Sequence, residues 1–221
     1  MFRSFFNPES PFFRFTGRVL DIVVLSVLWL VCSLPIVTIG PASAALYYSC
    51  AKCLRHQEPG PYRNFLSAFR QNLKTGIGAT VVCLLLAVLL DAGYLFLVMA
   101  AGTGGSVWGV VRIMYLVLLL IPVSMVSCAF PLLSRFTYTV GGLLSNSLRL
   151  TFRHLPRTVA AGALMVTAVI LTVLFWYYGV MLLTPALCAL LSTFLLEPVF
   201  RKYTPEEELE EEGVEPPWYL R

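Results

Sequence analysis

The residues that most often carry chemistry in proteins are represented here by six cysteines and two histidines. Cys50 and Cys53 have the CxxC spacing of zinc and redox sites, but no second CxxC or HxxH pair accompanies them. His56 and His154 are predicted to lie at the cytoplasmic ends of helices, in contact with solvent. The sequence contains no phosphate loop, GxSxG elbow or HExxH helix. We therefore expect no catalytic residue, no metal site and no cofactor, and the chain is not expected to be an enzyme.

Two charged residues, Asp91 and Arg112, lie inside long apolar runs of the sequence. An ionised side chain in hydrocarbon needs a partner or water. The two residues flank a predicted turn centred near residue 103, so antiparallel helices would place them at a similar depth. We expect them to form an ion pair that fixes the hairpin. Ion coupling is the alternative, but no cluster of acids accompanies Asp91 at this depth.

The composition indicates how these residues are positioned. The chain has 221 residues, of which 58% are hydrophobic and only 13% are charged, against about 25% charged in a typical soluble domain. This excludes an ordinary soluble fold and predicts an all-α, polytopic membrane protein in the plasma membrane, with residues 1–205 as a single transmembrane domain. Five apolar runs are long enough to cross a bilayer, namely 19–39, 77–101, 107–131, 159–178 and 180–196.

The charge distribution predicts the orientation. Residues 1–205 contain fifteen Lys and Arg against five Asp and Glu, whereas seven glutamates lie in residues 206–221. Long apolar runs interrupt the basic residues, which excludes a nucleic-acid-binding face. Basic loops favour the cytoplasm, and we therefore expect both termini to be cytoplasmic. With only one crossing before it, the basic segment 52–74 would lie outside, so the chain must cross or return once more.

A broken helix supplies this return. Its predicted elements are Pro35, Thr38, Gly40 and Pro41, after which Ala42–Leu54 offers a helix of about 20 Å. We expect a short crossing, and a re-entrant loop is the alternative. A broken helix in the membrane also frees backbone groups that can meet a ligand or partner, although a tight turn linking a hairpin explains the same residues.

Amphipathic helices are predicted on the cytoplasmic side. Segment 62–74 places aromatic and aliphatic side chains on one helical face and basic ones on the other, as in a helix that lies in the headgroup plane. The basic side chains here and near the fourth span are candidates for binding membrane lipids or for docking a partner, namely Arg63, Arg70, Lys74, Arg149, Arg153 and Arg157.

The acidic tail, residues 206–221, is predicted to be cytoplasmic. Thr204 followed by Pro205 and Glu207 resembles a capping box, which predicts a short helix over 206–212. Repulsion among the glutamates opposes that helix. The tail is therefore expected to be either disordered or docked on the basic cytoplasmic faces.

The stretch Trp29–Tyr48, WLVCSLPIVTIGPASAALYY, resembles the signature of the YesL-type family of small bacterial integral membrane proteins, which is assigned to a domain of unknown function. Phe65–Lys74 resembles the second block of that family, an aromatic and basic segment before a span. The resemblance implies an association with carbohydrate uptake systems of the ATP-binding-cassette type and with their two-component regulators. It implies no catalytic residues.

Three function classes follow from these observations. We expect a non-enzymatic accessory or regulatory membrane protein that binds a carbohydrate permease of the ATP-binding-cassette type or a sensor kinase through its basic helices. The alternative is a small-solute transporter or channel that uses the broken helix at Leu34 to Pro41. An intramembrane enzyme ranks third, since the sequence contains no recognisable pair of nucleophile and base.

Overall fold

The chain is all-α in the residues that the computed structural model describes, which are 11–101, 106–175, 179 and 182–203. This confirms the all-α part of the predicted fold class. Within these ranges, seven α-helices and three short helices of other types follow one another as α1 (Pro11–Cys32), η2 (Ile36–Thr38), α2 (Ile39–Ser49), η3 (Cys50–Arg55), α3 (Pro61–Ala101), α4 (Ser106–Arg135), α5 (Val140–Arg153), α6 (Leu155–Leu174), α7 (Thr184–Phe200) and η6 (Arg201–Tyr203). The predicted acidic tail, 206–221, lies outside the described residues.

The prediction of five long spans is wrong in number. In the described part of the chain, three helices are long and apolar enough to cross a bilayer, over Pro61–Met99, Val107–Arg135 and Leu155–Leu174. The first predicted span is interrupted because α1 ends at Cys32, just before a proline that disfavours helical geometry at Leu34. The last predicted span, 180–196, is shifted along the chain, because α7 begins at Thr184 with Pro185 in its first turn. Its 17 residues are fewer than the roughly 20 that a crossing needs.

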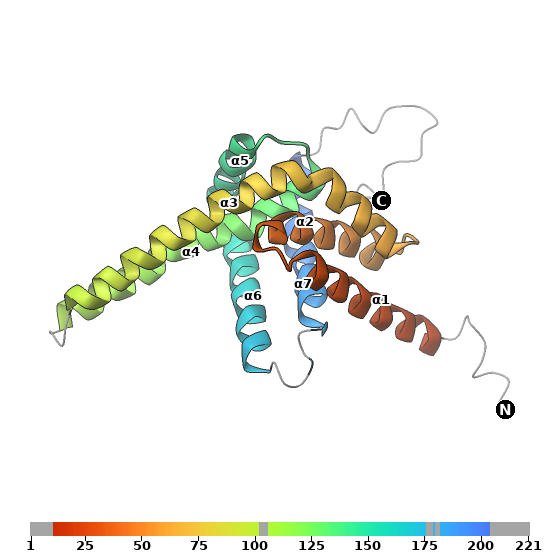
Figure 1. The fold of residues 1–221 in the computed structure, drawn as a ribbon, viewed down its shortest axis with the longest axis horizontal. Coiled ribbons are helices and arrows are strands. Elements are labelled where there is room, and N and C mark those ends of the chain that lie inside the picture. The colour runs from red at the N-terminus through yellow and green to blue at the C-terminus, as the bar shows by residue number, and fades with distance from the viewer. Residues whose placement is uncertain (1–10, 102–105, 176–178, 180–181, 204–221) are drawn as a thin grey trace.

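Helix α3 corrects a second expectation, that segment 62–74 forms a separate helix in the headgroup plane. The 41 residues of α3 are continuous and would extend for about 60 Å, so this segment is the first part of the same helix that later forms a candidate span. No proline interrupts it after Pro61. Figure 1 shows α3 crossing the upper side of the molecule and then projecting beside α4 to the lower left.

The predicted return is confirmed as a helix that folds back along α1. Helix α2 continues into the π-helical η3, so the return spans residues 39–55 rather than 42–54. The indole Nε1 of Trp29 donates to Ser43 Oγ at 3.1 Å. Further back along α1, Gly17 and Asp21 line one shallow hollow with Cys53 and Leu54, which shows that the two helices run in opposite directions.

Helix α2 lies at the centre of the fold. Eight of its eleven residues are buried, and it packs on α1, α3, α4 and α7. Small side chains allow these helices to approach closely. A Cβ on Gly40 would lie 2.0 Å from Thr80 Oγ1 of α3 and 2.4 Å from Phe130 of α4, so only glycine fits here. Neighbouring protein, rather than lipid, therefore surrounds most of the return helix.

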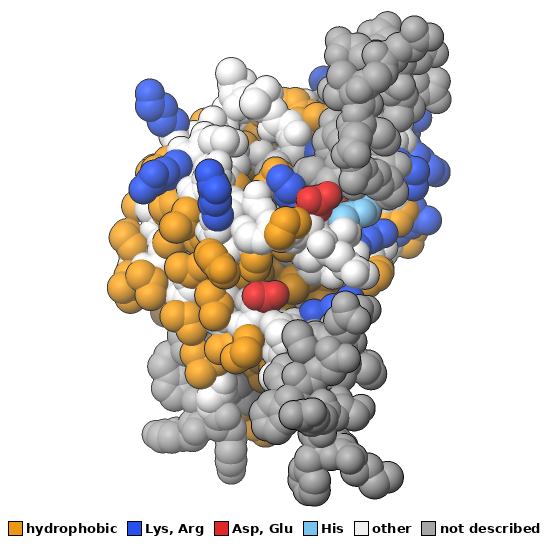
Figure 2. All heavy atoms as spheres, turned by 90° about the vertical axis from the view of Figure 1, so that its right-hand side faces the viewer, with side chains coloured by type: hydrophobic (Ala, Val, Ile, Leu, Met, Phe, Trp, Pro, Cys, Tyr) orange, Lys and Arg blue, Asp and Glu red, His pale blue; other side chains and the backbone are white. Residues whose placement is uncertain are grey.

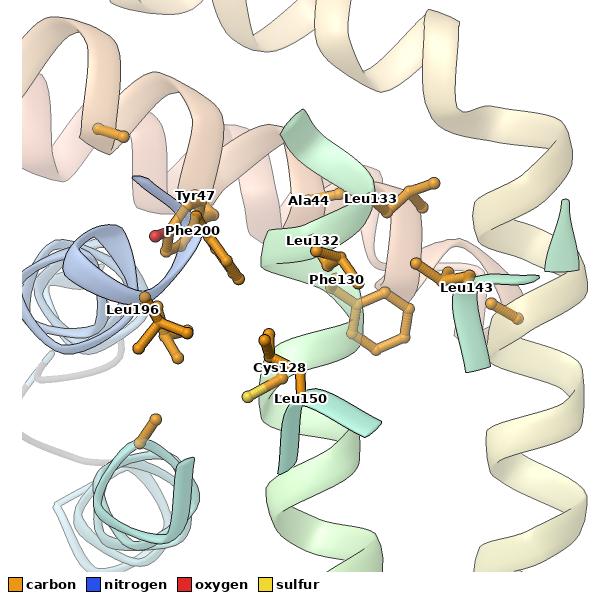
Figure 3. Close-up of a cluster of buried hydrophobic side chains, with 14 residues drawn as sticks. Ala44, Tyr47, Cys128, Phe130, Leu132, Leu133, Leu143, Leu150, Leu196 and Phe200 are labelled. Carbon is orange, nitrogen blue, oxygen red and sulfur yellow. The ribbon is translucent and has the colours of Figure 1, made fainter. Parts of the chain in front are cut away.

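The main core joins α2 to α4, α5 and α7. Figure 3 shows Tyr47 beside Phe200, while Leu132 and Phe130 of α4 lie between α2 and α5. The Tyr47 and Phe200 rings meet edge to face, with their centroids 6.3 Å apart. Cys128 is fully buried in the same cluster and acts as a small apolar side chain.

Outside this core, large apolar side chains are exposed along the candidate spans. Leu89 of α3 is 70% exposed, Met114 of α4 is 66% exposed and Val173 of α6 is 69% exposed. Figure 2 shows one face on which Lys and Arg side chains gather in the upper half and hydrophobic side chains lie below them. Exposed apolar helices of this length indicate a membrane protein, because contact with lipid tails is favourable for a large apolar surface and contact with water is not.

Candidate functional site

The interior of the fold holds a charged cluster, here called the ion-pair centre, made of Tyr47, Arg135 and Glu197. Arg135 Nη1 lies 3.0 Å from Glu197 Oε2, and the two side chains are only 4% and 6% exposed. The Tyr47 hydroxyl donates to Glu197 Oε1 at 3.4 Å. The three residues come from α2, α4 and α7, so the cluster holds the return helix against two helices that are distant in sequence.

A second arginine links η3 to α7 near the ion-pair centre. Arg55 Nη1 donates to the Thr193 carbonyl at 2.7 Å, and its guanidinium lies 5.0 Å from the centroid of the Phe194 ring. Partial burial and the positive charge of Arg55 lower the pKa of His56 below its usual range, so this imidazole is neutral at pH 7. Together with the ion-pair centre, these contacts hold α2, η3, α4 and α7 rigidly against one another.

The ion-pair centre was not predicted. In the structure Glu197 of α7 pairs with Arg135, which lies at the end of α4. The sequence did indicate that Glu197 has a partner, because an acid in an apolar helix needs a positively charged or polar group that is also shielded from water. Sequence spacing alone does not identify that partner when it lies on another helix.

A surface hollow of about 200 Å³, here called the α4–α5 hollow, lies between the ends of α4 and α5 and the short helix η6. Leu132, Leu150 and Phe200 contribute apolar side chains to its lining, and Arg149 and Arg153 contribute positive charge. The remaining lining residues are Phe136, Tyr138, Asn146 and Tyr203. The hollow thus combines an apolar surface with two guanidinium groups, which suits an anionic ligand that also carries apolar groups.

Two residues where α5 meets α6, Arg153 and His154, hold Tyr203 at the edge of this hollow. The Arg153 guanidinium lies 5.6 Å from the centroid of the Tyr203 ring. His154 Nε2 lies 3.2 Å from the Tyr203 hydroxyl, with the two rings edge to face. Partial desolvation, with the positive charges of Lys202, Arg153 and Arg157, lowers the pKa of His154, so its ring is neutral at pH 7.

All six basic side chains predicted to bind lipids or a partner are exposed. Three of them, Arg63, Arg70 and Lys74, lie on the first part of α3. Of the other three, Arg149 and Arg153 meet at the α4–α5 hollow, and Arg157 lies in the first turn of α6. The structure therefore divides the predicted set into two groups, one on α3 and one around the junction of α5 and α6.

The broken helix is closed by contacts within the protein. The Thr38 hydroxyl lies 2.6 Å from the carbonyl of Cys32 and 2.7 Å from that of Pro35, and it donates to both. The Ser33 hydroxyl donates to the Trp29 carbonyl at 2.5 Å. The Trp29 and Pro35 carbonyls also accept backbone N–H bonds, from Ser33 and Thr38 respectively, each at 2.9 Å. Gly40 and Pro41 are buried, whereas Pro35 is exposed, and the segment is best described as a tight turn.

Asp91 and Arg112 lie on neighbouring stretches of α3 and α4, the first exposed and the second half-buried. Tyr115, one turn after Arg112, donates its hydroxyl to the Leu90 carbonyl at 2.6 Å. Close packing occurs at the same level, because a Cβ on Gly93 would lie 2.8 Å from the Tyr115 hydroxyl oxygen. These contacts place the two charged residues about one helical turn apart along the hairpin. The ion pair between them stays a prediction.

Comparison with known proteins finds a match to a family over the first part of the chain. Residues 22–94 match the family described as Protein of unknown function, DUF624. The matched region contains both blocks on which the resemblance rests, Trp29–Tyr48 and Phe65–Lys74. In the structure it runs from α1 through α2 and η3 into the candidate span of α3. No curated protein matches the chain, and no solved structure matches it.

Proposed function

We propose that this chain is a non-enzymatic accessory membrane protein that binds a partner complex through its exposed basic helix surfaces. The observation that carries the proposal is the exposure of all six basic side chains on α3, α5 and α6. Guanidinium and ammonium groups displayed in this way can pair with carboxylates of a partner or with lipid phosphates. The closed ion-pair centre and the packed broken helix are consistent with a rigid scaffold.

The partner class comes from the resemblance to the YesL-type family. That resemblance extends the proposal to a carbohydrate importer of the ATP-binding-cassette type or to a sensor kinase that regulates one. The proposal also requires the basic surfaces to face the cytoplasm, together with both chain termini. Positive-inside bias supports this orientation.

The orientation is tested with a cysteine at position 63. We expect Arg63→Cys to react with a membrane-impermeant maleimide in inverted membrane vesicles and to stay unlabelled in intact cells. A Cys-to-Ser background removes the six native thiols, which are unpaired in the described structure. Labelling of position 63 from the outer surface alone would overturn the cytoplasmic assignment and the docking proposal that depends on it.

Docking itself is tested by crosslinking and mass spectrometry of the tagged chain from native membranes. We expect crosslinks to a carbohydrate permease or sensor kinase, and their loss in Arg70→Ala and Arg153→Ala with normal insertion. Gln71→Ala is the matched control, because Gln71 is also exposed on α3 and carries no charge. Flux of a saccharide or ion through proteoliposomes that contain this chain alone would instead establish the transporter alternative.

A further inference from the structure

The α4–α5 hollow has an arrangement of charge that suits a particular pattern of ligand. Arg149 and Arg153 supply two guanidinium groups, while Leu132, Leu150 and Phe200 supply apolar surface beside them. A ligand that matches this lining needs negative charges with an apolar group between or next to them. Both arginines are exposed and so remain available to such a ligand.

The described chain leaves the fold at the edge of this hollow. Tyr203 lines the hollow and is held by the Arg153 guanidinium, 5.6 Å from its ring centroid, and by His154, 3.2 Å from its hydroxyl. The residue that follows Tyr203 therefore begins from a fixed point beside one of the two arginines.

The sequence beyond this point has the matching pattern. Residues 206–212 read EEELEEE, so six glutamates surround the single apolar residue Leu209. Glu206 follows Tyr203 by three residues, a reach of at most about 10 Å when fully extended. A tether this short gives an effective concentration in the millimolar range. Glutamates of this segment can consequently reach Arg153, which itself contacts Tyr203.

From the geometry of the hollow and the pattern of the tail, we propose that the acidic segment 206–212 of this chain binds in its own α4–α5 hollow. Its glutamates pair with Arg149 and Arg153, and Leu209 rests on the apolar lining. The segment thereby covers two of the six basic residues assigned to docking. This inference does not depend on the proposed function, because it concerns contacts within one chain.

The first test uses an endoprotease that cleaves after glutamate, applied to the full chain in neutral detergent at low salt. We expect Arg149→Gln combined with Arg153→Gln to speed cleavage within 206–212 by about three-fold or more, because the paired glutamates are released. Arg63→Gln combined with Arg70→Gln is the matched control, which removes two exposed arginines from α3. Ionic strength of about 0.5 M should remove the difference by screening.

A second measurement does not require the arginine variants to fold. A photo-crosslinking amino acid, p-benzoylphenylalanine, replaces Asn146 in the lining of the hollow, and a parallel variant carries it in place of Gln71 on α3. We expect peptides from 204–215 to be captured from position 146 in a product of monomer mass, and not from position 71. Leu209→Ser should reduce that capture.

Other occupants are distinguished by the same experiments. Equal cleavage rates in the wild type and the double variant would overturn the proposal. Capture of the tail of a second copy, at dimer mass, would also overturn it. In bilayers that contain phosphatidylglycerol, capture of this lipid from position 146 in place of the tail would instead assign the hollow to an anionic lipid.

Discussion

Removal of Arg135 or of Glu197 alone should destabilise the fold strongly, whereas removal of both should not. Arg135 and Glu197 are 3.0 Å apart and almost fully buried. At an effective dielectric constant of about 20, their gross attraction is about 5–6 kcal/mol. Burial of each ion costs several kcal/mol, so the attraction offsets that cost with little surplus. Arg135→Met leaves the Glu197 charge buried without its partner.

The expected loss for Arg135→Met is about 3–5 kcal/mol of unfolding free energy, which corresponds to a melting temperature lower by about 6–20 °C for a chain of this size. The double variant Arg135→Met with Glu197→Leu buries no charge at either position, and we expect it to melt within about 4 °C of the wild type. Thermal unfolding in detergent, followed by intrinsic fluorescence, measures both values.

Arg70→Met is the matched control, because this arginine is exposed on α3 and its loss should change the unfolding free energy by less than about 0.5 kcal/mol. The reasoning is refuted if the stability losses of Arg135→Met alone and Glu197→Leu alone add up to the loss of the double variant. Additive losses would mean that the two side chains are not energetically coupled, despite their contact.

The remaining predictions concern the packing of the return helix. Gly40→Ala should lower the unfolding free energy by about 1–3 kcal/mol, because its Cβ would overlap Thr80 Oγ1 of α3. Gly109→Ala in α4 is the control, since nothing lies within 4 Å of the added carbon, and it should be neutral or stabilise by up to about 1 kcal/mol. Arg55→Ala should cost about 1.5–3 kcal/mol through loss of its hydrogen bond to the Thr193 carbonyl, and unchanged melting would show that this bond does not hold η3 to α7.

The return of the chain after α1 could be predicted because its cause is local. Pro35 disfavours helical geometry in the residue before it, and Pro41 fits the first turn of the next helix. The charge balance then required the basic segment 52–74 to lie on the same side as the N-terminus. Each step uses neighbouring residues or counts of charge. The structure confirms the reversal itself, in the contact between Trp29 and Ser43.

The elements that sequence reasoning missed depend on contacts between distant helices. Composition changes near Lys74, which suggested a boundary inside α3, but nothing there breaks the backbone and the helix continues. The partner of Glu197 is Arg135 on another helix, and the α4–α5 hollow requires η6 to fold against α5. The pattern of apolar and polar residues within one helix does not reveal these contacts, because they depend on how different helices pack against one another.

The position of the family match favours packing as the role of the WLVCSLPIVTIGPASAALYY stretch. The match to residues 22–94 includes the most buried helix of the fold, α2. Within it, Ala44 and Ala45 are fully buried, and Gly40 has no room for a Cβ. A site that receives a ligand would need open space beside its polar groups, whereas Thr38 donates its hydroxyl to carbonyls of the same turn. The distinctive residues of this stretch therefore pack α2 against α1, α3 and α4, and the docking surfaces that we propose are the exposed basic faces of α3 and α5.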